Sequence, residues 1–293
     1  MADGLPYNFG GIPPVSYKNA KVLVLPVPHE MTVSFRRGTR FGPENIILAS
    51  RHMEIWDEET GIDAEECGIH TLPEIDPESD SVHAMMKVIE KTVLSHLKRE
   101  KFICALGGEH SISFPLIKAH KKYFPDLCVV QLDAHADMRD TLGGSKYSHG
   151  TVMRRVRELG CETHGIGVRS LSKEESEYLR KDSHAHCHFA STLYATAWDK
   201  IVHTIPDIPI YLTIDMDFFD PAIMPETGTP EPGGFFWPET VLFLRKLFAE
   251  RTIIGIDMVE FAPSTLYSPS SFLSSKLLFT LIALHTFHHQ KKV

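Results

Sequence analysis

The feature that most limits the possible folds of this chain is a repeated alternation between short apolar runs and amphipathic segments. Residues 21–28 (KVLVLPVP) form one apolar run, and in residues 81–100 apolar side chains recur every three or four positions, as on one face of a helix. Strands that are apolar on both faces belong to parallel sheets that helices cover on both sides. The pattern predicts an α/β fold, and since the sequence contains no linker or repeat, a single domain over residues 1–293.

The same periodicities locate the other elements. Strands are predicted over residues 21–28, 102–108, 127–137, 163–170, 185–191, 208–221 and 252–263. Helices are predicted over residues 81–100, 111–124, 151–159, 193–205 and 238–251, with a charged helix after residue 170 and a long helix at the carboxyl terminus. Ser111 or Ser113 is expected to be the N-cap of the second helix.

Composition excludes several function classes. Hydrophobic residues make up 43% of the 293 residues, the formal net charge is −8 and no basic run occurs, so a nucleic-acid partner is not expected. The amino terminus lacks the pattern of a secretory signal, and no uncharged apolar stretch of about 18 residues occurs, so no membrane span is expected. The five cysteines are scattered without a Cys-x-x-Cys pair, which predicts reduced thiols in a cytoplasmic protein.

One predicted strand ends in an unusual set of polar residues. Residues 131–137 (QLDAHAD) place Asp133, His135 and Asp137 at alternate positions. Alternate side chains of an extended chain point to one side, so the three are expected to share a face if the strand continues through the intervening alanines. In parallel sheets ligands bind at the carboxyl ends of the strands, where this segment lies.

Two other strand ends carry similar residues. Asp215 and Asp217 alternate at the end of the strand over residues 208–221, and His110 follows two glycines after the strand over residues 102–108. Four buried carboxylates need compensating charge, which two divalent cations would supply. Oxygen and imidazole ligands without thiolate favour Mn²⁺, and two such ions can lower the pKa of a shared water. A lone histidine after a glycine pair is usually a turn residue and a lone Asp-x-Asp usually a cap, so the prediction rests on their combination.

Further motifs occur in the order and at about the spacing of one enzyme family. They are GGEHS (107–111), DAHAD (133–137), SHG (148–150), DMDFFDP (215–221), GTPEPGG (228–234) and VEFAP (259–263). Together with residues 33–46 (VSFRRGTRFGPENI), they resemble the ureohydrolases, which include arginase and agmatinase, and are most like agmatinase. The resemblance covers residues from about 20 to 280.

The resemblance implies a three-layer α/β/α fold of the arginase type, with a central, mainly parallel sheet and two Mn²⁺ ions per subunit. It implies that one metal takes His110, Asp133, Asp137 and Asp215, and the other takes Asp133, His135, Asp215 and Asp217. Asp133 and Asp215 would then bridge the two ions. Asp220, which precedes a proline, is interpreted as fixing the turn after its strand.

The reaction implied is hydrolysis of a guanidino group to urea and an amine. Asp137 is expected to orient the attacking water and to pass a proton to the departing nitrogen. By resemblance, Glu260 pairs with the substrate guanidinium, and His149 is a proton shuttle near the leaving amine. Alone, Glu260 would be read as an ordinary strand-end acid and His149 as a surface loop residue.

The substrate is the least constrained part of the hypothesis. The segments SHG and GTPEPGG look closer to agmatinases than to arginases, which favours agmatine, hydrolysed to putrescine and urea. Guanidinobutyrate, aminopropylagmatine, arginine and formiminoglutamate are the alternatives. Two segments depart from the family pattern: Glu226, expected to add a charge near the pocket rim, and residues 267–277 (YSPSSFLSSKL).

Other interpretations stay open beside the enzyme. The protein could be a non-catalytic binding or regulatory member of the same fold, whereas a binuclear phosphoesterase lacks support because the chain has no Asn-His pair. Residues 184–188 (HAHCH) alternate like a metal-binding strand but lack acidic partners in the sequence, so a partly exposed strand is predicted there. The resemblance also implies a homo-oligomer, a trimer or hexamer.

Overall fold

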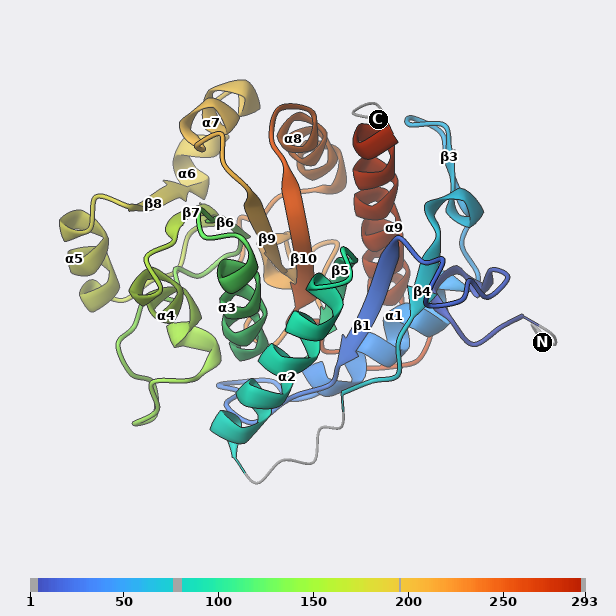
Figure 1. Cartoon of the computed structure of the whole chain (residues 1–293). Coiled ribbons are helices and arrows are strands. Elements are labelled where there is room, and N and C mark those ends of the chain that lie inside the picture. Colours follow the sequence, from blue (N-terminus) through green and yellow to red (C-terminus); the bar gives the residue numbers. More distant parts are fainter. Residues whose placement is uncertain (1–4, 76–80, 195, 291–293) are drawn as a thin grey trace.

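Eight strands form one central sheet in the order β4-β1-β5-β10-β9-β6-β7-β8, and every pairing in it is parallel (Figure 1). The structure is a computed structural model and describes residues 5–75, 81–194 and 196–290. Two further strands form a small antiparallel pair. The sheet has the parallel arrangement that the apolar runs predict.

The strands and helices have the following bounds. The strands are β1 (Val22–Val27), β2 (Trp56–Asp57), β3 (Ile62–Asp63), β4 (Ile69–Thr71), β5 (Phe102–Gly107), β6 (Cys128–Leu132), β7 (Glu162–Val168), β8 (Ala185–Phe189), β9 (Ile210–Asp215) and β10 (Ile253–Val259). The α-helices are α1 (Gly42–Ser50), α2 (Val82–Leu97), α3 (Ser113–Tyr123), α4 (Val152–Glu158), α5 (Lys173–Lys181), α6 (Ala190–Leu193), α7 (Trp198–Thr204), α8 (Trp237–Glu250) and α9 (Pro269–Gln290). Short 3₁₀ turns are η1 (Phe9–Gly11), η2 (Thr39–Phe41), η3 (Ala64–Cys67), η4 (His110–Ile112), η5 (His149–Thr151) and η6 (Met216–Phe218).

Helices cover both faces of the sheet, which makes three layers. Alternate residues of one strand enter different hydrophobic clusters: Cys104 and Leu106 of β5 pack on one face, and Ile103 and Ala105 on the other. Helices α2, α3 and α4 contribute to the second cluster, and α1, α7, α8 and α9 to the first (Figure 1). This confirms the three-layer α/β/α prediction, while the single domain over residues 1–293 stays a prediction.

Several local predictions were wrong in detail. Neither Ser111 nor Ser113 caps α3, because the turn η4 precedes the helix, Ile112 is its N-cap, and the Ser111 hydroxyl donates to Glu109 instead (2.6 Å). The helix predicted over residues 193–205 is observed as α7, and the prediction also includes residue 195, which lies outside the described residues. Helix α6 overlaps this prediction only at Leu193 and begins inside the strand predicted over residues 185–191.

Helix α9 is long and apolar enough to cross a membrane by length and composition, but 72% of its most apolar window is buried inside the fold. Its buried residues pack in the same hydrophobic cluster as α1 and α8. α9 is therefore placed as a core helix. The five cysteines are free, as the sequence predicts, and four of them are buried.

Candidate metal centre and active site

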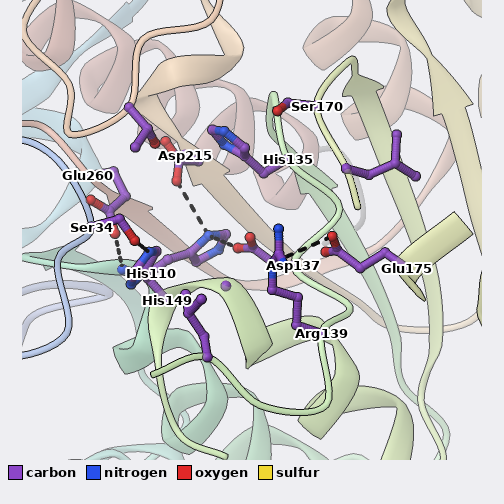
Figure 2. Close-up of a pocket in the computed structure, with 14 residues that line it drawn as sticks. Ser34, His110, His135, Asp137, Arg139, His149, Ser170, Glu175, Asp215 and Glu260 are labelled. Atoms are coloured by element: carbon purple, nitrogen blue, oxygen red, sulfur yellow. Dashed lines mark hydrogen bonds and ion pairs between the residues drawn. The ribbon is translucent and has the colours of Figure 1, made fainter. Parts of the chain in front are cut away.

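A cavity of about 270 Å³ opens near the carboxyl ends of the central strands (Figure 2). Its lining includes six of the residues predicted from the sequence: His110, His135, Asp137, His149, Asp215 and Glu260. The other two, Asp133 and Asp217, are buried and contact the lining histidines. The structure therefore brings all eight predicted residues to one place.

His110 is the centre of the first group. It begins η4 directly after β5, and its Nδ1 atom lies 3.2 Å from Asp133 Oδ2, 2.9 Å from Asp137 Oδ2 and 3.4 Å from Asp215 Oδ2. Gly108 permits this turn, because a Cβ at that position would lie 2.0 Å from the carbonyl oxygen of His29. Three carboxylates thus face one ring nitrogen, and among the described residues none of its contacts has hydrogen-bond geometry.

The other ring nitrogen of His110 is held by a buried relay that the sequence analysis missed. Nε2 lies 3.0 Å from the Thr213 hydroxyl, which itself donates to Asp257 Oδ1 at 2.6 Å. The Thr213 hydroxyl donates its hydrogen to Asp257, so Thr213 can only accept from Nε2–H of His110. In the neutral ring, the lone pair is therefore on Nδ1. Asp257 also accepts from Tyr211 (2.8 Å). The only sequence signal was the polar residues inside the strands β9 and β10.

The second group lies beside the first and shares Asp133 with it. His135 Nδ1 lies 2.9 Å from Asp217 Oδ2 and 3.5 Å from Asp133 Oδ1. Asp217 is in turn held by the backbone amide of Ala134, which donates to its Oδ1 at 3.0 Å. In each group, His110–Asp133–Asp215 and Asp133–His135–Asp217, the ligand atoms lie within 4.8 Å of one another.

The backbone at the site differs from the extended strand that the alternation of Asp133, His135 and Asp137 suggested. β6 ends at Leu132, and Asp137 has a left-handed backbone with φ of 54°. Asp217 lies in the turn η6 and not in β9. Left-handed backbone is costly for a residue with a side chain, so the surrounding structure must hold Asp137 there. The side chains converge through these turns and not through strand alternation.

Electrostatics at the site call for a cation. Burial, reinforced by the charges of Asp217 and Asp133, raises the pKa of Asp215 well above its usual range. Burial and Asp133 raise the pKa of Asp137 to about 7. Oxygen atoms and imidazole nitrogens at this spacing suit hard or borderline divalent metals. The donor set, with Nδ1 of His110 facing three carboxylates, therefore fits metal ions between them.

Two predicted residues stand beside the metal ligands at the cavity wall. Glu260 follows β10 with φ of 62°, and its Oε1 accepts from the backbone amide of His110 at 2.7 Å. Burial raises the Glu260 pKa to about 8, so this carboxyl favours a cation beside it. His149 Nε2 lies 2.8 Å from the Ser34 hydroxyl, and burial lowers the His149 pKa (Figure 2).

Glu109 ties an amino-terminal loop to the site, a role that the sequence analysis missed although the residue lies in the GGEHS motif. Its buried carboxylate accepts from the amides of Met31 and Thr32, both at 2.6 Å, and from the Thr32 hydroxyl at 2.7 Å. Thr32 also lies 3.3 Å from His149 Nδ1. The loop that carries Ser34 is thereby held against His149.

Two predictions about acidic residues have opposite outcomes. Asp220 accepts from the amides of Ala222, Gly233 and Gly234 at 2.9–3.0 Å, which confirms that it fixes the turn. Glu226 is not a charge on the pocket rim: it is 6% exposed, and it accepts from Ser264 and Ser268. The prediction was wrong because the serines that donate to Glu226 are distant from it in the sequence.

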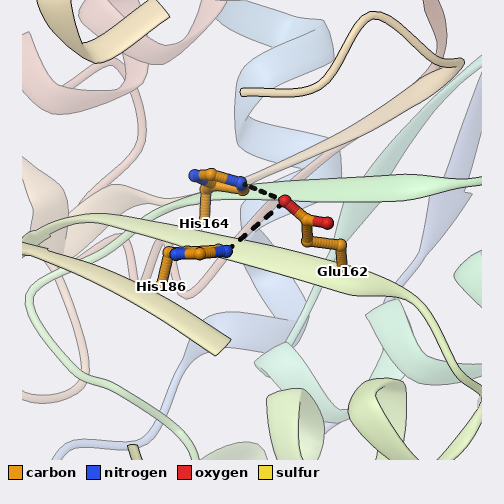
Figure 3. Close-up of side chains that lie close together, drawn as sticks. All are labelled: Glu162, His164 and His186. Atoms are coloured by element: carbon orange, nitrogen blue, oxygen red, sulfur yellow. Dashed lines mark hydrogen bonds and ion pairs between the residues drawn. The ribbon is translucent and has the colours of Figure 1, made fainter. Parts of the chain in front are cut away.

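The prediction that the HAHCH segment lacks acidic partners was also wrong. β8 is partly exposed, as expected, but Glu162 of the neighbouring strand β7 lies 3.4 Å from His186 Nε2 and 3.8 Å from His184 Nδ1 (Figure 3). His164 of β7 completes a group of three possible ligands with Glu162 and His186. The pairing of β7 with β8, which brings them together, is not visible in the sequence.

The fold and the site together define an α/β protein with two groups of possible metal ligands, which share Asp133, at the carboxyl edge of a parallel sheet. Comparison with known proteins agrees with this class. A model of the arginase family matches residues 20–283, and the chain belongs to this family. This confirms the resemblance found in the motifs.

Individual relatives cover nearly the whole chain. It is 36% identical to the N(1)-aminopropylagmatine ureohydrolase of Synechocystis sp. over 288 residues, 95% of this chain and 93% of the relative. It is 33% identical to the agmatinase of Pyrococcus horikoshii, over 93% of this chain and 95% of the relative. The crystal structure of the agmatine ureohydrolase of Thermoplasma volcanium superposes with a TM-score of 0.86 at 32% identity, covering 95% of this chain and 94% of that one.

Proposed function

We propose that the protein is a metal-dependent amidinohydrolase that hydrolyses agmatine to putrescine and urea. Membership of the arginase family makes it an enzyme that cleaves guanidino C–N bonds. The observation that carries the proposal is that two ligand groups share Asp133 beneath a cavity that Glu260 and His149 also line. A site with two adjacent metals and a carboxylate for the guanidinium suits this reaction.

The proposed metals are two Mn²⁺ ions per subunit, held by His110, Asp133, His135, Asp137, Asp215 and Asp217. Asp133 belongs to both ligand groups, which supports its bridging role, and Asp215 belongs to the first. The bound cations would make water a strong nucleophile at neutral pH. Thr213 and Asp257 hold the hydrogen of the neutral His110 ring on Nε2, which leaves the lone pair of Nδ1 available to a metal.

The other residues bind the substrate and move protons. Glu260 Oε1 accepts from the His110 amide, so Oε2 is the oxygen that accepts from the substrate guanidinium. Asp137 takes a proton from the water that attacks the guanidinium carbon and passes it toward the departing nitrogen. His149, neutral at pH 7 because burial lowers its pKa, relays a proton to the leaving amine. Water and the guanidine thus yield urea and a free amine.

Agmatine is proposed as the substrate because relatives named agmatinase and agmatine ureohydrolase match almost the whole chain. The second candidate is aminopropylagmatine, since the Synechocystis relative carries that name. The test is urea release by the Mn²⁺-loaded protein with agmatine, aminopropylagmatine, guanidinobutyrate and arginine. We expect the highest kcat/KM for agmatine. Urea from none of these compounds would contradict the proposal and favour a non-catalytic member of the fold.

The proposed setting follows the same resemblance. We propose a cytoplasmic homo-oligomer, a trimer or hexamer, with a small guanidino compound as its ligand and without a nucleic-acid or membrane partner. The acidic balance of the chain, a net charge of −8, supports the absence of a nucleic-acid partner. Light scattering on the purified protein tests the assembly.

A further inference from the structure

A cluster of histidines lies at the edge of the sheet, away from the cavity. β8 is the last strand in the sheet, and in its register with β7 His164 pairs with His186. Paired residues of neighbouring strands project from the same face, and so does Glu162, two positions before His164. Glu162 is the first residue of β7, so the cluster lies toward the amino ends of the strands, whereas the active site lies at the carboxyl ends.

The donor atoms of this cluster lie within 4.8 Å of one another. Glu162 Oε1 lies 3.0 Å from His164 Nε2 and 3.4 Å from His186 Nε2 (Figure 3). The two rings are stacked, with centroids 4.4 Å apart and planes inclined by 22°. With metal–ligand bonds of about 2.0–2.1 Å, the ligands of a tetrahedral zinc ion lie about 3.3 Å apart. The observed separations from Glu162 Oε1 match this value.

The charge states suit a metal as well. Burial, supported by the nearby His186, lowers the pKa of His164 to about 4, so this imidazole is neutral at pH 7. Burial opposes ionisation of Glu162, but its hydrogen bond with His164 leads the effects that outweigh burial and lower the pKa. In the described part of the chain, the ion-pair partners of Glu162 are all histidines. An ionised carboxylate thus faces the neutral imidazole of His164, which is the ligand form of both groups.

A third and a fourth histidine support the cluster. His188 Nε2 lies 3.3 Å from His164 Nδ1, on the ring edge away from Glu162. A partner on the second nitrogen fixes the orientation of a ligating imidazole. His184 Nδ1 lies 3.8 Å from Glu162 Oε2, and its side chain is 65% exposed. A metal would therefore have an open approach from solvent and a further nitrogen within reach.

We propose that Glu162, His164 and His186 form a second metal site, for Zn²⁺, which fastens the edge strand β8 to β7. Two imidazoles and a carboxylate are a known zinc ligand set, and His184 or water fills the fourth position. Imidazole nitrogen also favours Zn²⁺ over Mn²⁺, which separates this site chemically from the carboxylate-rich centre. The metal would join two neighbouring strands, β7 and β8, outside the cavity, so its expected effect is on stability.

The test counts zinc per chain. Wild type, His186→Ala and Glu162→Gln are stripped with a chelator, dialysed against Zn²⁺ and measured by elemental analysis. Whatever zinc enters the active-site centre does so equally in all three proteins, so we expect both variants to hold one equivalent less than wild type. Zn²⁺ at about 100 times Kd should also raise the Tm of wild type by about 5 °C more than that of either variant.

His203→Ala is the matched control. His203 Nε2 lies 3.4 Å from Glu250 Oε2, an exposed His–Glu pair that belongs to none of the three-ligand groups among the described residues. It should keep the wild-type zinc count, and guanidine hydrolysis by Mn²⁺-loaded His186→Ala should stay within twofold of wild type, which also shows that the variant folds. Equal zinc counts in wild type, His186→Ala and Glu162→Gln would overturn the proposal, and so would an equal loss in His203→Ala.

Discussion

At the scale of single residues, the site is organised by His110 and Asp133. Thr213 and Asp257 assign the hydrogen of the neutral His110 ring to Nε2, so that its Nδ1 faces three carboxylates with a lone pair. Asp133 then connects this group with His135, since it belongs to both. A change at Asp133 should therefore affect two metal positions, whereas a change at either histidine should affect one.

Asp133→Asn is expected to lose both metals and activity together. The amide removes a charge shared by the two groups but keeps the size of the side chain and an oxygen that can accept from Gln131, which donates to Asp133 Oδ2 at 2.7 Å. We expect Mn²⁺ affinity and kcat/KM to fall by more than about 100-fold, beyond the loss typical for residues that only support a ligand. Metal content by elemental analysis and urea release measure the two effects.

The matched control for this variant is Asp220→Asn. Asp220 also follows β9, but it accepts from three backbone amides and belongs to neither ligand group. It should keep the full metal content, with a modest loss of stability. Full turnover in Asp133→Asn, or loss of metal in Asp220→Asn, would show that the ligands are assigned wrongly.

Glu260→Gln is expected to keep the metals and lose catalysis. The amide oxygen of glutamine can still accept from the His110 amide, so the metal ligand stays in place, but the charge that pairs with the guanidinium is gone. A hydrogen bond to a charged group contributes about 1.5–3 kcal/mol, which predicts a loss of about 10- to 100-fold in kcat/KM. If the variant instead lost Mn²⁺, Glu260 would have to be counted among the metal ligands.

At the scale of elements, periodicity predicted most strands and helices because each depends on its own local sequence. β1, β5, β9 and β10 fall within the predicted apolar runs, and α2 within its predicted helix. The six predicted metal ligands could be named in advance because strand ends of one parallel sheet meet at one edge, whereas Glu260 and His149 were named only by resemblance to the family. Local sequence does not determine how the chain leaves a strand, and therefore the left-handed turn at Asp137 was missed.

Contacts between elements distant in sequence were also beyond prediction. Glu226 looked like a lone departure from the family pattern, and so did the serine-rich segment at the start of α9. In the structure they meet, because Glu226 accepts from Ser268, whose hydroxyl lies 2.9 Å from that of Ser271. The Glu162 cluster has the same origin, since it depends on the register of β7 and β8. A single sequence carries no signal for such pairings.

Helix α3 is joined to the sheet through a buried histidine, which makes stability depend on pH. His120 is fully buried, its ring packs against Tyr211, and burial lowers its pKa from 6.5 to about 4. The unfolded chain binds a proton near pH 6.5, whereas the folded protein does so only near pH 4. The unfolded state thus holds more protons between these values, and stability falls as the pH is lowered from about 6.5 to 4.

His120→Gln tests this coupling. At pH 5 the wild-type histidine should cost about 2 kcal/mol of unfolding free energy relative to pH 8, and glutamine does not titrate. We expect the difference in stability between pH 8 and pH 5, from urea unfolding, to be smaller in the variant by about this amount. The variant is less stable at both pH values if packing suffers, but that loss cancels in the difference. An unchanged pH dependence would mean that His120 is not held neutral.

At the scale of the whole molecule, the sheet supplies a rigid apolar frame and the loops at its carboxyl edge gather four buried carboxyl groups. The frame has two hydrophobic clusters that hold the strands from both faces. The site, in contrast, places Asp133, Asp137, Asp215 and Asp217 close together with two histidines, and burial and repulsion raise the pKa of Asp215. The folded state should therefore gain stability when cations neutralise this edge.

Metal removal should consequently destabilise the entire fold and not only abolish activity. Ligands that bind only the folded state contribute about 2.7 kcal/mol each at 100 times Kd, and a chain of this size changes Tm by about 2–4 °C per kcal/mol, so two Mn²⁺ ions should raise Tm by about 10 °C or more. Calorimetry of chelator-treated protein, with Mn²⁺ as the only metal added back, measures the shift. Asp133→Asn should show little of it, because its ligand groups are broken. A Tm that does not respond to Mn²⁺ in the wild type would mean that the carboxylates of this edge are neutralised by protons and do not need the metals.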